Sequence, residues 1–478
     1  MIDRAQTSVG AVLEGCAPDP CVAYAALSPW HPFALLESAS LHSATGKRTF
    51  LGLGPRPLYR CKNARGPQDL LQLQQSLDRW RDAWISDGGD PYGIVFAVFA
   101  YEWKNALEVL PQTTAGDLEF PDAWLAACRD LLVWDHAERS LGIHCTYRDG
   151  GQSREEASQR LRAIQKCLQR LGEQTVAPPS DPHSCWAEDP SFFPGNWKSN
   201  MSRPEFLAGV RRMKGYIAAG DIYQANLSQR FQTMGPAQGL DLYARLRQIN
   251  PSPFSGFVQG EDWELISCSP ERLICKEGNT LQTRPIAGTR PRGVDSQADG
   301  RFARELFLSP KERSEHIMLV DLERNDLGRV CEKGTVRADE IMTLEKYSHV
   351  QHIVSNVTGT LRPQTPFVEI LRAVFPGGTI TGVPKIRCMQ ILDEIEPTAR
   401  GPYTGSFGYL DSRGDFDLNI AIRTILKQGE ILTVQAGAGI VADSDPAAEY
   451  QETLDKAKAM ALAVELSSAK IPRATISG

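Results

Sequence analysis

The alternation of apolar and polar residues predicts both helices and strands along this chain. One amphipathic helix begins at a capping box formed by Ser202 and Glu205 and ends at Gly220. Its buried stripe consists of Phe206, Val210, Met213 and Ile217. Further helices are predicted at 67–83 and 153–172. Short apolar runs bounded by turn residues predict strands, among them Phe33–Ser38, Thr49–Leu53, Gly93–Tyr101 and Asp130–Trp134. These elements indicate an α+β or mixed α/β fold.

The composition along the chain divides it into two regions. Residues 1–175 carry the strands and helices of a first α/β region. The stretch 174–183 contains three prolines in ten residues, so we expect a linker at 176–194. From 195 to 470, polar glycine-rich stretches recur between apolar strands, a pattern typical of many segments that converge on one polar cavity.

Composition and charge exclude several classes of function. The chain has 478 residues, of which 42% are hydrophobic and 23% charged, so we expect a folded globular protein. A net charge of −6 gives no basic surface for nucleic acid. There is no apolar run near the roughly 18 residues of a membrane span and no signal-peptide core, so we expect a cytoplasmic protein. The 11 scattered cysteines form no C-x-x-C pair, which argues against a zinc site.

The C-terminal part contains a helix with a mixed-charge face. Helix-capping residues place its start near Asp445, so that Glu449, Glu452 and Lys456 share one side. The small residues of Ala436–Ala442 lead directly into it and would allow a ligand to approach the backbone closely. The alternative is a solvated face held by charge pairs.

A second helix carries another pair of glutamates. Ser309 is its predicted N-cap, and Glu312 and Glu315 follow three residues apart. Glu312 also fits the capping-box position, which offers a purely structural explanation for that residue. Two helices with paired glutamates indicate a hard-cation site of the Mg²⁺ type, with oxygen ligands throughout.

Two other motifs are weaker. Gly377–Lys385 has the glycine and lysine content of a phosphate loop, but it lacks the required spacing. His349 and His352 lie three residues apart in a stretch that suits a strand, where they would face opposite sides. We therefore expect one histidine at a site and no nucleotide at this loop.

The order of five motifs resembles a known family. These motifs are Pro285–Thr289, Asp321–Val330, Phe375–Lys385, Ala436–Ala442 and Glu449–Lys456. Together they resemble the chorismate-binding domain shared by anthranilate synthase component I, aminodeoxychorismate synthase component I, and the isochorismate and salicylate synthases. The resemblance implies a sandwich of two mostly antiparallel sheets flanked by helices, with the N-terminal region wrapped onto the same core.

The resemblance also implies ligands for each part of the site. Glu315 and Glu452 would bind Mg²⁺ directly, with Glu312 and Glu449 close by, and the ion would hold the ring carboxylate of chorismate. Arg423 would bind the second carboxylate as a charge-assisted fork. The substrate-binding residues implied in this way are Gly288, Thr289, Tyr403, Arg423, Gly437, Ala438, Gly439 and Lys456.

Three residues carry the implied chemistry. Glu271 matches the general acid that protonates the departing hydroxyl, and His352 matches the histidine that handles a proton or orients the leaving group. Gln224 occupies the position at which the water-adding members have a lysine base. A neutral amide cannot deprotonate water, so the resemblance implies ammonia as the nucleophile.

Two sets of residues bear on the position of amination. The stretches 223–227, 251–255, 404–409 and 417–419 favour para amination, the reaction of aminodeoxychorismate synthase component I. Ala287 favours the ortho reaction of anthranilate synthase component I, because the para enzymes typically use a lysine there as a covalent nucleophile. We expect the para reaction and keep the ortho reaction as the alternative.

Two further expectations concern partners and regulation. The sequence lacks the G-x-C-x-G elbow of a glutaminase, so we expect a separate glutamine amidotransferase subunit to supply ammonia in a heterodimer. The stretch 35–38 resembles the tryptophan feedback site of anthranilate synthases. The candidate tryptophan site comprises Ser38, Pro253, Phe254 and Ser255. A non-catalytic tryptophan-binding homologue remains an alternative, against which the intact acidic residues and His352 argue.

Overall fold

A computed structural model describes most of the chain. The described residues are 6–14, 17–38, 47–85, 93–148, 151–172, 196–292, 295–346 and 350–467. The expected linker at 176–194 and His349 lie outside these ranges. No helix within them has both the length and the apolar character needed to cross a membrane.

The first region alternates strands and helices. Its elements are β1 (Gln6–Glu14), α1 (Pro20–Ala26), β2 (Pro32–Glu37), β3 (Arg48–Cys61), α2 (Pro67–Ile85), β4 (Ile94–Phe99), α3 (Lys104–Leu107), β5 (Ala123–Asp135), β6 (Ser140–Arg148) and α4 (Gly151–Leu171). Helices α2 and α4 confirm the two amphipathic helices predicted here. The predicted strand at 130–134 is only the second half of β5.

The second region is longer and richer in strands. It comprises β7 (Lys198–Ser199), α5 (Arg203–Ala218), β8 (Gln224–Met234), α6 (Gly239–Ile249), β9 (Phe254–Gln259), β10 (Glu264–Ser269), β11 (Arg272–Glu277), β12 (Thr280–Arg284), β13 (Ile286–Pro291), α7 (Ser296–Leu308), α8 (Pro310–Gly328), β14 (Arg337–Lys346), β15 (Val350–Thr360), α9 (Phe367–Val374), β16 (Gly382–Val383), α10 (Lys385–Ile395), β17 (Ser406–Asp411), β18 (Phe416–Ile420), β19 (Thr424–Gln428), β20 (Ile431–Ile440) and α11 (Pro446–Ser467). Helix α5 confirms its predicted capping box, because Ser202 and Glu205 bond reciprocally.

The strands form a continuous antiparallel system that divides at β5. Residues 123–127 of β5 pair with β4, residues 130–135 pair with β6, and β3 runs along the opposite edge. One arm continues through β3, β2, β9, β10, β19 and β20 to β8. The other continues through β4, β17, β18, β11 and β12 to β15. These two arms are the two sheets of the expected sandwich.

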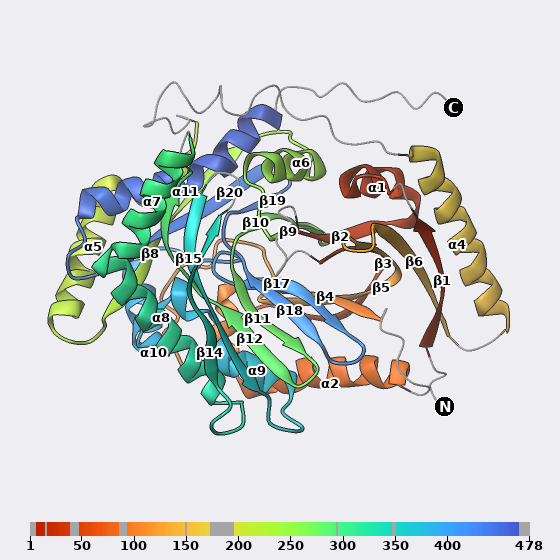
Figure 1. Cartoon of the computed structure of the whole chain (residues 1–478), viewed down its shortest axis with the longest axis horizontal. Helices are drawn as coiled ribbons and strands as arrows, with labels where there is room; N and C mark the ends of the chain where they lie inside the picture. Colours follow the sequence, from red (N-terminus) through yellow and green to blue (C-terminus); the bar gives the residue numbers. More distant parts are fainter. Residues whose placement is uncertain are drawn as a thin grey trace.

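Three apolar clusters hold the layers together. Between the arms, side chains from β2, β4, β5, β9, β10, β17 and β19 form one core. Helices α1, α4, α6 and α11 cover the outer face of the first arm, and α2, α3, α8 and α9 cover that of the second (Figure 1). Because both outer faces are covered, burial of apolar surface stabilises both arms.

The two regions of the chain share these sheets. Strand β2 pairs with β9, and β4 pairs with β17, so residues from the first 175 positions pair with residues that are 218 or more positions later. The N-terminal region is thus interleaved with the later region, as the expected wrapping requires.

Candidate active site

Glu271 lies in the turn between β10 and β11, and its side chain is buried. Its carbonyl accepts a hydrogen bond from the Ile420 amide at 3.0 Å, which fixes the turn against β18. Burial raises the pKa of Glu271 to about 7, while Thr379, the Ile286 main chain and the charge of Lys456 partly oppose the rise. A carboxyl group with this pKa is part protonated at neutral pH and can donate a proton.

His352 lies beside a bulge in the neighbouring strand. The register between β13 and β15 shifts around Gly288, which has φ +66°, and the Gly288 carbonyl accepts from Nδ1 of His352 at 3.2 Å. Burial lowers the pKa of His352 to about 4, so its ring is neutral at pH 7. A Cβ atom at 288 would lie 2.8 Å from Oε2 of Glu312. The bulge therefore brings His352 close to Glu312. Thr289 pairs through its main chain with His352.

Strands β8 and β20 form another wall. Their pairing places Gly437 and Gly439 beside side chains of β8, because a Cβ at 439 would lie 2.8 Å from Nε2 of Gln224. A Cβ at 437 would lie 2.8 Å from both Oδ1 of Asn226 and the hydroxyl of Tyr403. Within the described part of the chain, the buried Oε1 of Gln224 has no hydrogen-bond partner. The side chains of Gln224, Asn226 and Tyr403 therefore converge on β20. They can lie this close to its main chain only because residues 437 and 439 are glycines.

Ala438 lies between these two glycines and belongs to an apolar cluster of α5, β8, β20 and α10. Adjacent residues of a strand face opposite sides, so its methyl group points away from the polar wall. Any contact of Ala438 with a ligand on that wall would have to come from its main chain.

Arg423 and Lys456 connect the strands to α11. Nη1 of Arg423 donates to the carbonyl of Lys456, and Nζ of Lys456 donates to the Gly437 carbonyl at 3.0 Å. The same ammonium lies 2.7 Å from Oε1 of Glu452. Burial lowers the pKa of Arg423, and Tyr403 and Glu452 oppose this effect. Because Tyr403 affects the pKa of Arg423, these two predicted carboxylate binders lie close to each other.

The pair Glu312 and Glu315 lies at the start of α8. Ser309 caps the helix by accepting from the Glu312 amide at 3.3 Å. The Glu312 carboxylate forms an ion pair with Arg290 at 3.2 Å, so the structural explanation by a reciprocal capping box does not account for its side chain. Glu315 is half-buried one turn further along the helix.

The pair Glu449 and Glu452 lies at the start of α11. Oδ1 of Asp445 accepts from the Ala447 and Ala448 amides, which confirms the predicted helix start. Glu449 is buried and Glu452 is exposed. Within the described residues, no three His, Cys, Asp or Glu side chains are already arranged to hold a metal ion. The two pairs of carboxylates nevertheless supply the oxygen donors that Mg²⁺ prefers.

Lys385 and its neighbours have a structural role at the discounted phosphate loop. Nζ of Lys385 lies 2.6 Å from Oδ2 of Asp326 and donates to the Val374 carbonyl at 2.9 Å. Burial and the Asp326 charge raise the pKa of the neighbouring Glu323 to about 8, and Glu271 adds to this rise. This buried acidic group could not be predicted from the sequence, because charged residues on helices usually face solvent.

The residues of the candidate tryptophan site also meet. The Ser38 hydroxyl is buried and donates to the Pro253 carbonyl at 2.9 Å, and the Ser255 hydroxyl donates to the Ser252 carbonyl at 3.0 Å. The ring of Phe254 lies under the guanidinium of Arg272 at 5.1 Å. The hydroxyls of both serines therefore bond to main-chain carbonyls of the 250–255 turn.

Comparison with known proteins identifies the family. The sequence pattern described as chorismate binding enzyme matches residues 19–462. The chain belongs to this family. It is 42% identical over 378 residues to aminodeoxychorismate synthase component 1 of Bacillus subtilis, covering 79% of this chain and 78% of that protein. It is 46% identical over 448 residues to anthranilate synthase component 1 of Aquifex aeolicus, covering 91% and 89%.

A solved structure of the family has the same fold. Anthranilate synthase component I from Streptococcus pneumoniae superposes with a TM-score of 0.71 at 31% identity, covering 88% of this chain and 94% of that chain. An aminodeoxychorismate synthase component and anthranilate synthase components are thus all similar to the chain along most of its length, and overall similarity does not separate the two kinds of synthase.

Proposed function

We propose that the protein is an aminodeoxychorismate synthase component I, which replaces the C4 hydroxyl of chorismate with an amino group. The position of the Gln224 side chain is the observation that supports amination. Its neutral amide lies beside Gly439, and its buried Oε1 has no hydrogen-bond partner among the residues that the structure describes. An amide oxygen can accept a hydrogen bond from ammonia but cannot remove a proton from water.

Glu271 supplies the proton in this proposal. Its carboxyl group donates a proton to the C4 hydroxyl as the C4–O bond breaks, and water leaves. Ammonia forms the new C4–N bond with its lone pair, and a proton of the resulting ammonium group returns to Glu271. Its pKa of about 7 suits both steps, because the group is neither a strong acid nor fully protonated. His352, neutral at this pH, can orient the leaving hydroxyl by a hydrogen bond.

The remaining residues bind and orient the substrate. Arg423 and Lys456 supply positive charge for a carboxylate, and Tyr403 supplies a hydroxyl donor. Glu312, Glu315, Glu449 and Glu452 would hold Mg²⁺, which when bound supplies positive charge for the ring carboxylate. Metal binding would compete with the ion pairs that Glu312 forms with Arg290 and Glu452 forms with Lys456.

One contact links the general acid to a stretch that favours the para enzymes. Asp417, from a stretch that favours the para enzymes, accepts two hydrogen bonds from Arg272 at 2.9 and 2.7 Å. Arg272 directly follows Glu271, so this stretch helps to fix the acid. Ala287 favours the second candidate, ortho amination to anthranilate, because it cannot form the covalent bond to C2 that a lysine would form. Para amination by this protein would use ammonia directly.

A second subunit completes the proposal. The names of the relatives, component 1, imply another component, and the sequence contains no glutaminase elbow. We therefore assign ammonia supply to a separate glutamine amidotransferase.

Product analysis tests the function. The purified chain is given chorismate, Mg²⁺ and ammonium, and products are analysed by mass and fluorescence with and without an aminodeoxychorismate lyase. The proposal predicts a non-fluorescent amino product that becomes 4-aminobenzoate only with the lyase. Anthranilate formed without the lyase would establish the ortho reaction instead. Unchanged chorismate would contradict both candidates.

A further inference from the structure

Arg400 is a buried cation that neither the sequence motifs nor the proposed chemistry explains. We infer that Arg400 is a positioning residue that orients Tyr403 for substrate binding and ties the active site to the N-terminal region. This inference rests on the proposed function, in which Tyr403 binds a carboxylate of the substrate. Arg400 lies in the loop between α10 and β17 and is only 1% exposed.

Every N–H group of the Arg400 guanidinium has a partner inside the protein. Nε and Nη2 donate to the two carboxylate oxygens of Glu396 at 2.8 and 2.7 Å, and Nη2 also donates to the Asn226 carbonyl at 2.7 Å. Nη1 donates to the Thr404 hydroxyl at 3.1 Å and the Ile380 carbonyl at 3.3 Å. A guanidinium has five N–H donors, and here all are used. Lysine could not reproduce this planar arrangement.

The guanidinium also contacts two aromatic rings. Its central carbon lies 4.7 Å from the ring centre of Tyr101 and 5.6 Å from that of Tyr403. Tyr101 belongs to the N-terminal region and Tyr403 to the candidate site. One cation therefore holds a ring from each region by cation–π attraction, which strengthens when the cation is removed from water.

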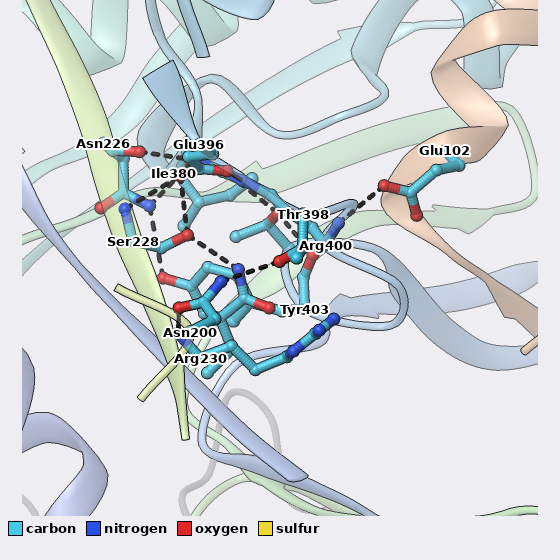
Figure 2. Close-up of polar contacts among 12 residues, drawn as sticks. Glu102, Asn200, Asn226, Ser228, Arg230, Ile380, Glu396, Thr398, Arg400 and Tyr403 are labelled. Atoms are coloured by element: carbon cyan, nitrogen blue, oxygen red, sulfur yellow. Dashed lines mark hydrogen bonds and ion pairs between the residues drawn. The ribbon is translucent and has the colours of Figure 1, made fainter. Parts of the chain in front are cut away.

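The same cluster fixes the hydroxyl end of Tyr403 (Figure 2). Nδ2 of Asn226 donates to the Tyr403 hydroxyl at 3.3 Å and to the Ile380 carbonyl at 3.1 Å. Glu396, the ion-pair partner of Arg400, accepts from the amide and hydroxyl of Ser228 at 2.9 and 2.7 Å. Asn226 and Ser228 both lie on β8, so the Arg400–Glu396 pair holds the strand that also carries Gln224. Tyr403 is thereby held at its ring and at its hydroxyl.

Glu102 holds the main chain of the Arg400 loop from the N-terminal side. Its two carboxylate oxygens accept from the Arg400 amide at 2.8 Å and the Gly401 amide at 2.9 Å. The Tyr101 amide returns a hydrogen bond to the Gly401 carbonyl at 2.8 Å. Gly401 has φ +63°, a conformation that other residues rarely adopt. The segment 101–103 after β4 therefore fixes the loop that presents Tyr403.

Kinetics of substitutions in the full chain test the inference. Tyr403→Phe removes the hydroxyl and should raise KM for chorismate by about tenfold, the effect of one lost hydrogen bond to a charged group. Arg400→Lys should raise KM by about tenfold or more while kcat changes less than about threefold. The variant loses contacts that bind the substrate and the transition state equally, but it keeps the groups that carry out the reaction. The double variant should be no worse than Arg400→Lys by more than about twofold, because the two residues act through one contact.

Two further variants separate positioning from folding. Arg160→Lys is the matched control, since Arg160 also donates to both oxygens of a buried carboxylate, Asp130, but lies on α4, which packs against β1 and β6. It should lower the melting temperature and leave both kinetic constants unchanged. Tyr101→Leu removes only the N-terminal ring and should raise KM by about threefold, as a lost cation–π contact predicts. It provides the measurement if Arg400→Lys does not fold.

The outcomes distinguish the inference from the proposed function. If Tyr403→Phe leaves KM unchanged, the proposed role of Tyr403 in binding is wrong. If Tyr403→Phe raises KM while Arg400→Lys and Tyr101→Leu alter only the melting temperature, as Arg160→Lys does, the positioning role is wrong. Multiplicative effects of Arg400→Lys and Tyr403→Phe on KM would also overturn it.

Discussion

The carboxyl groups of the candidate site fall into two environments. Glu271 lies in a buried turn, where it forms no ion pair with a described residue, and its pKa rises to about 7. Glu312 and Glu452 lie at the starts of α8 and α11, where each is paired with a cation. The same side chain is therefore suited to donate a proton in one place and to bind a cation in the other. Solvent access and neighbouring charge, and not residue type, decide the role.

The largest predicted effect comes from the buried group. Glu271→Gln preserves the shape of the side chain but removes its proton donor, so kcat should fall by about 10²- to 10⁴-fold. Steady-state rates with ammonium and Mg²⁺ measure this, with chorismate binding followed separately by fluorescence or calorimetry. A variant that keeps more than a tenth of the activity would mean that another group protonates the hydroxyl.

The same substitution should have a pH-dependent effect on stability. Below pH 4.5 the carboxyl group is protonated in both the folded and the unfolded state. As pH rises to about 7, the unfolded state ionises first, so the wild-type protein loses roughly 3 kcal/mol of its free energy of unfolding. Urea unfolding at pH 5 and pH 9 should show Glu271→Gln gaining about this amount relative to wild type at the higher pH. Glu452→Gln should change stability by less than about 1 kcal/mol at both. If both variants change the free energy of unfolding by the same amount at each pH, the two environments do not differ in their effect on a carboxyl group.

The helix glutamates should control the metal requirement instead. Glu452→Gln and Glu315→Gln are each expected to raise the Mg²⁺ concentration for half-maximal activity by about 10- to 100-fold, the range seen when a metal's surroundings are disturbed. Asp455→Asn is the control, because Asp455 is an exposed carboxylate on α11 that bonds only to Gln451 among the contacts described. Titration of Mg²⁺ for each variant gives the result, and identical titration curves would argue against a metal between these helices.

The pH profile should follow the buried group alone. At a fixed concentration of free ammonia, kcat/KM should be constant below pH 7 and fall about tenfold per pH unit above it, because ionised Glu271 cannot donate. Ionisation of His352, whose pKa is about 4, should not affect the profile above pH 5. If the residual activity of Glu271→Gln still falls above pH 7, the group whose ionisation causes the fall is another residue.

Much of this arrangement could be predicted from sequence. Periodicity and capping identified α2, α4, α5, α8 and α11, because these signals are local. The double pairing of β5 could not be predicted, since the pattern indicated only residues 130–134 as a strand and the neighbours of each half depend on the fold. Asn226 could have been found, because it lies two residues after Gln224 and shares its face of β8. Arg400 could not, because arginines are mostly exposed and its partners include residues from three other segments of the chain, at 101–102, 226 and 380.

The roles of the glutamates were likewise only partly predictable. Their spacing on the helices was visible, whereas the ion pairs with Arg290 and Lys456 depend on the fold. The raised pKa of Glu271 results from burial between strands distant in sequence, which no local pattern reveals.

The interleaving of β2 and β4 with later strands affects the order in which the protein can fold during synthesis. When the ribosome has made the first 175 residues, β4 still lacks its neighbour β17, which ends at Asp411. The apolar edge of β4 therefore stays unpaired while more than two hundred further residues are made. Contacts this distant slow folding and prolong exposure to aggregation. Chains cut short before β17 should accordingly be chaperone clients, even though they contain an almost complete N-terminal sheet.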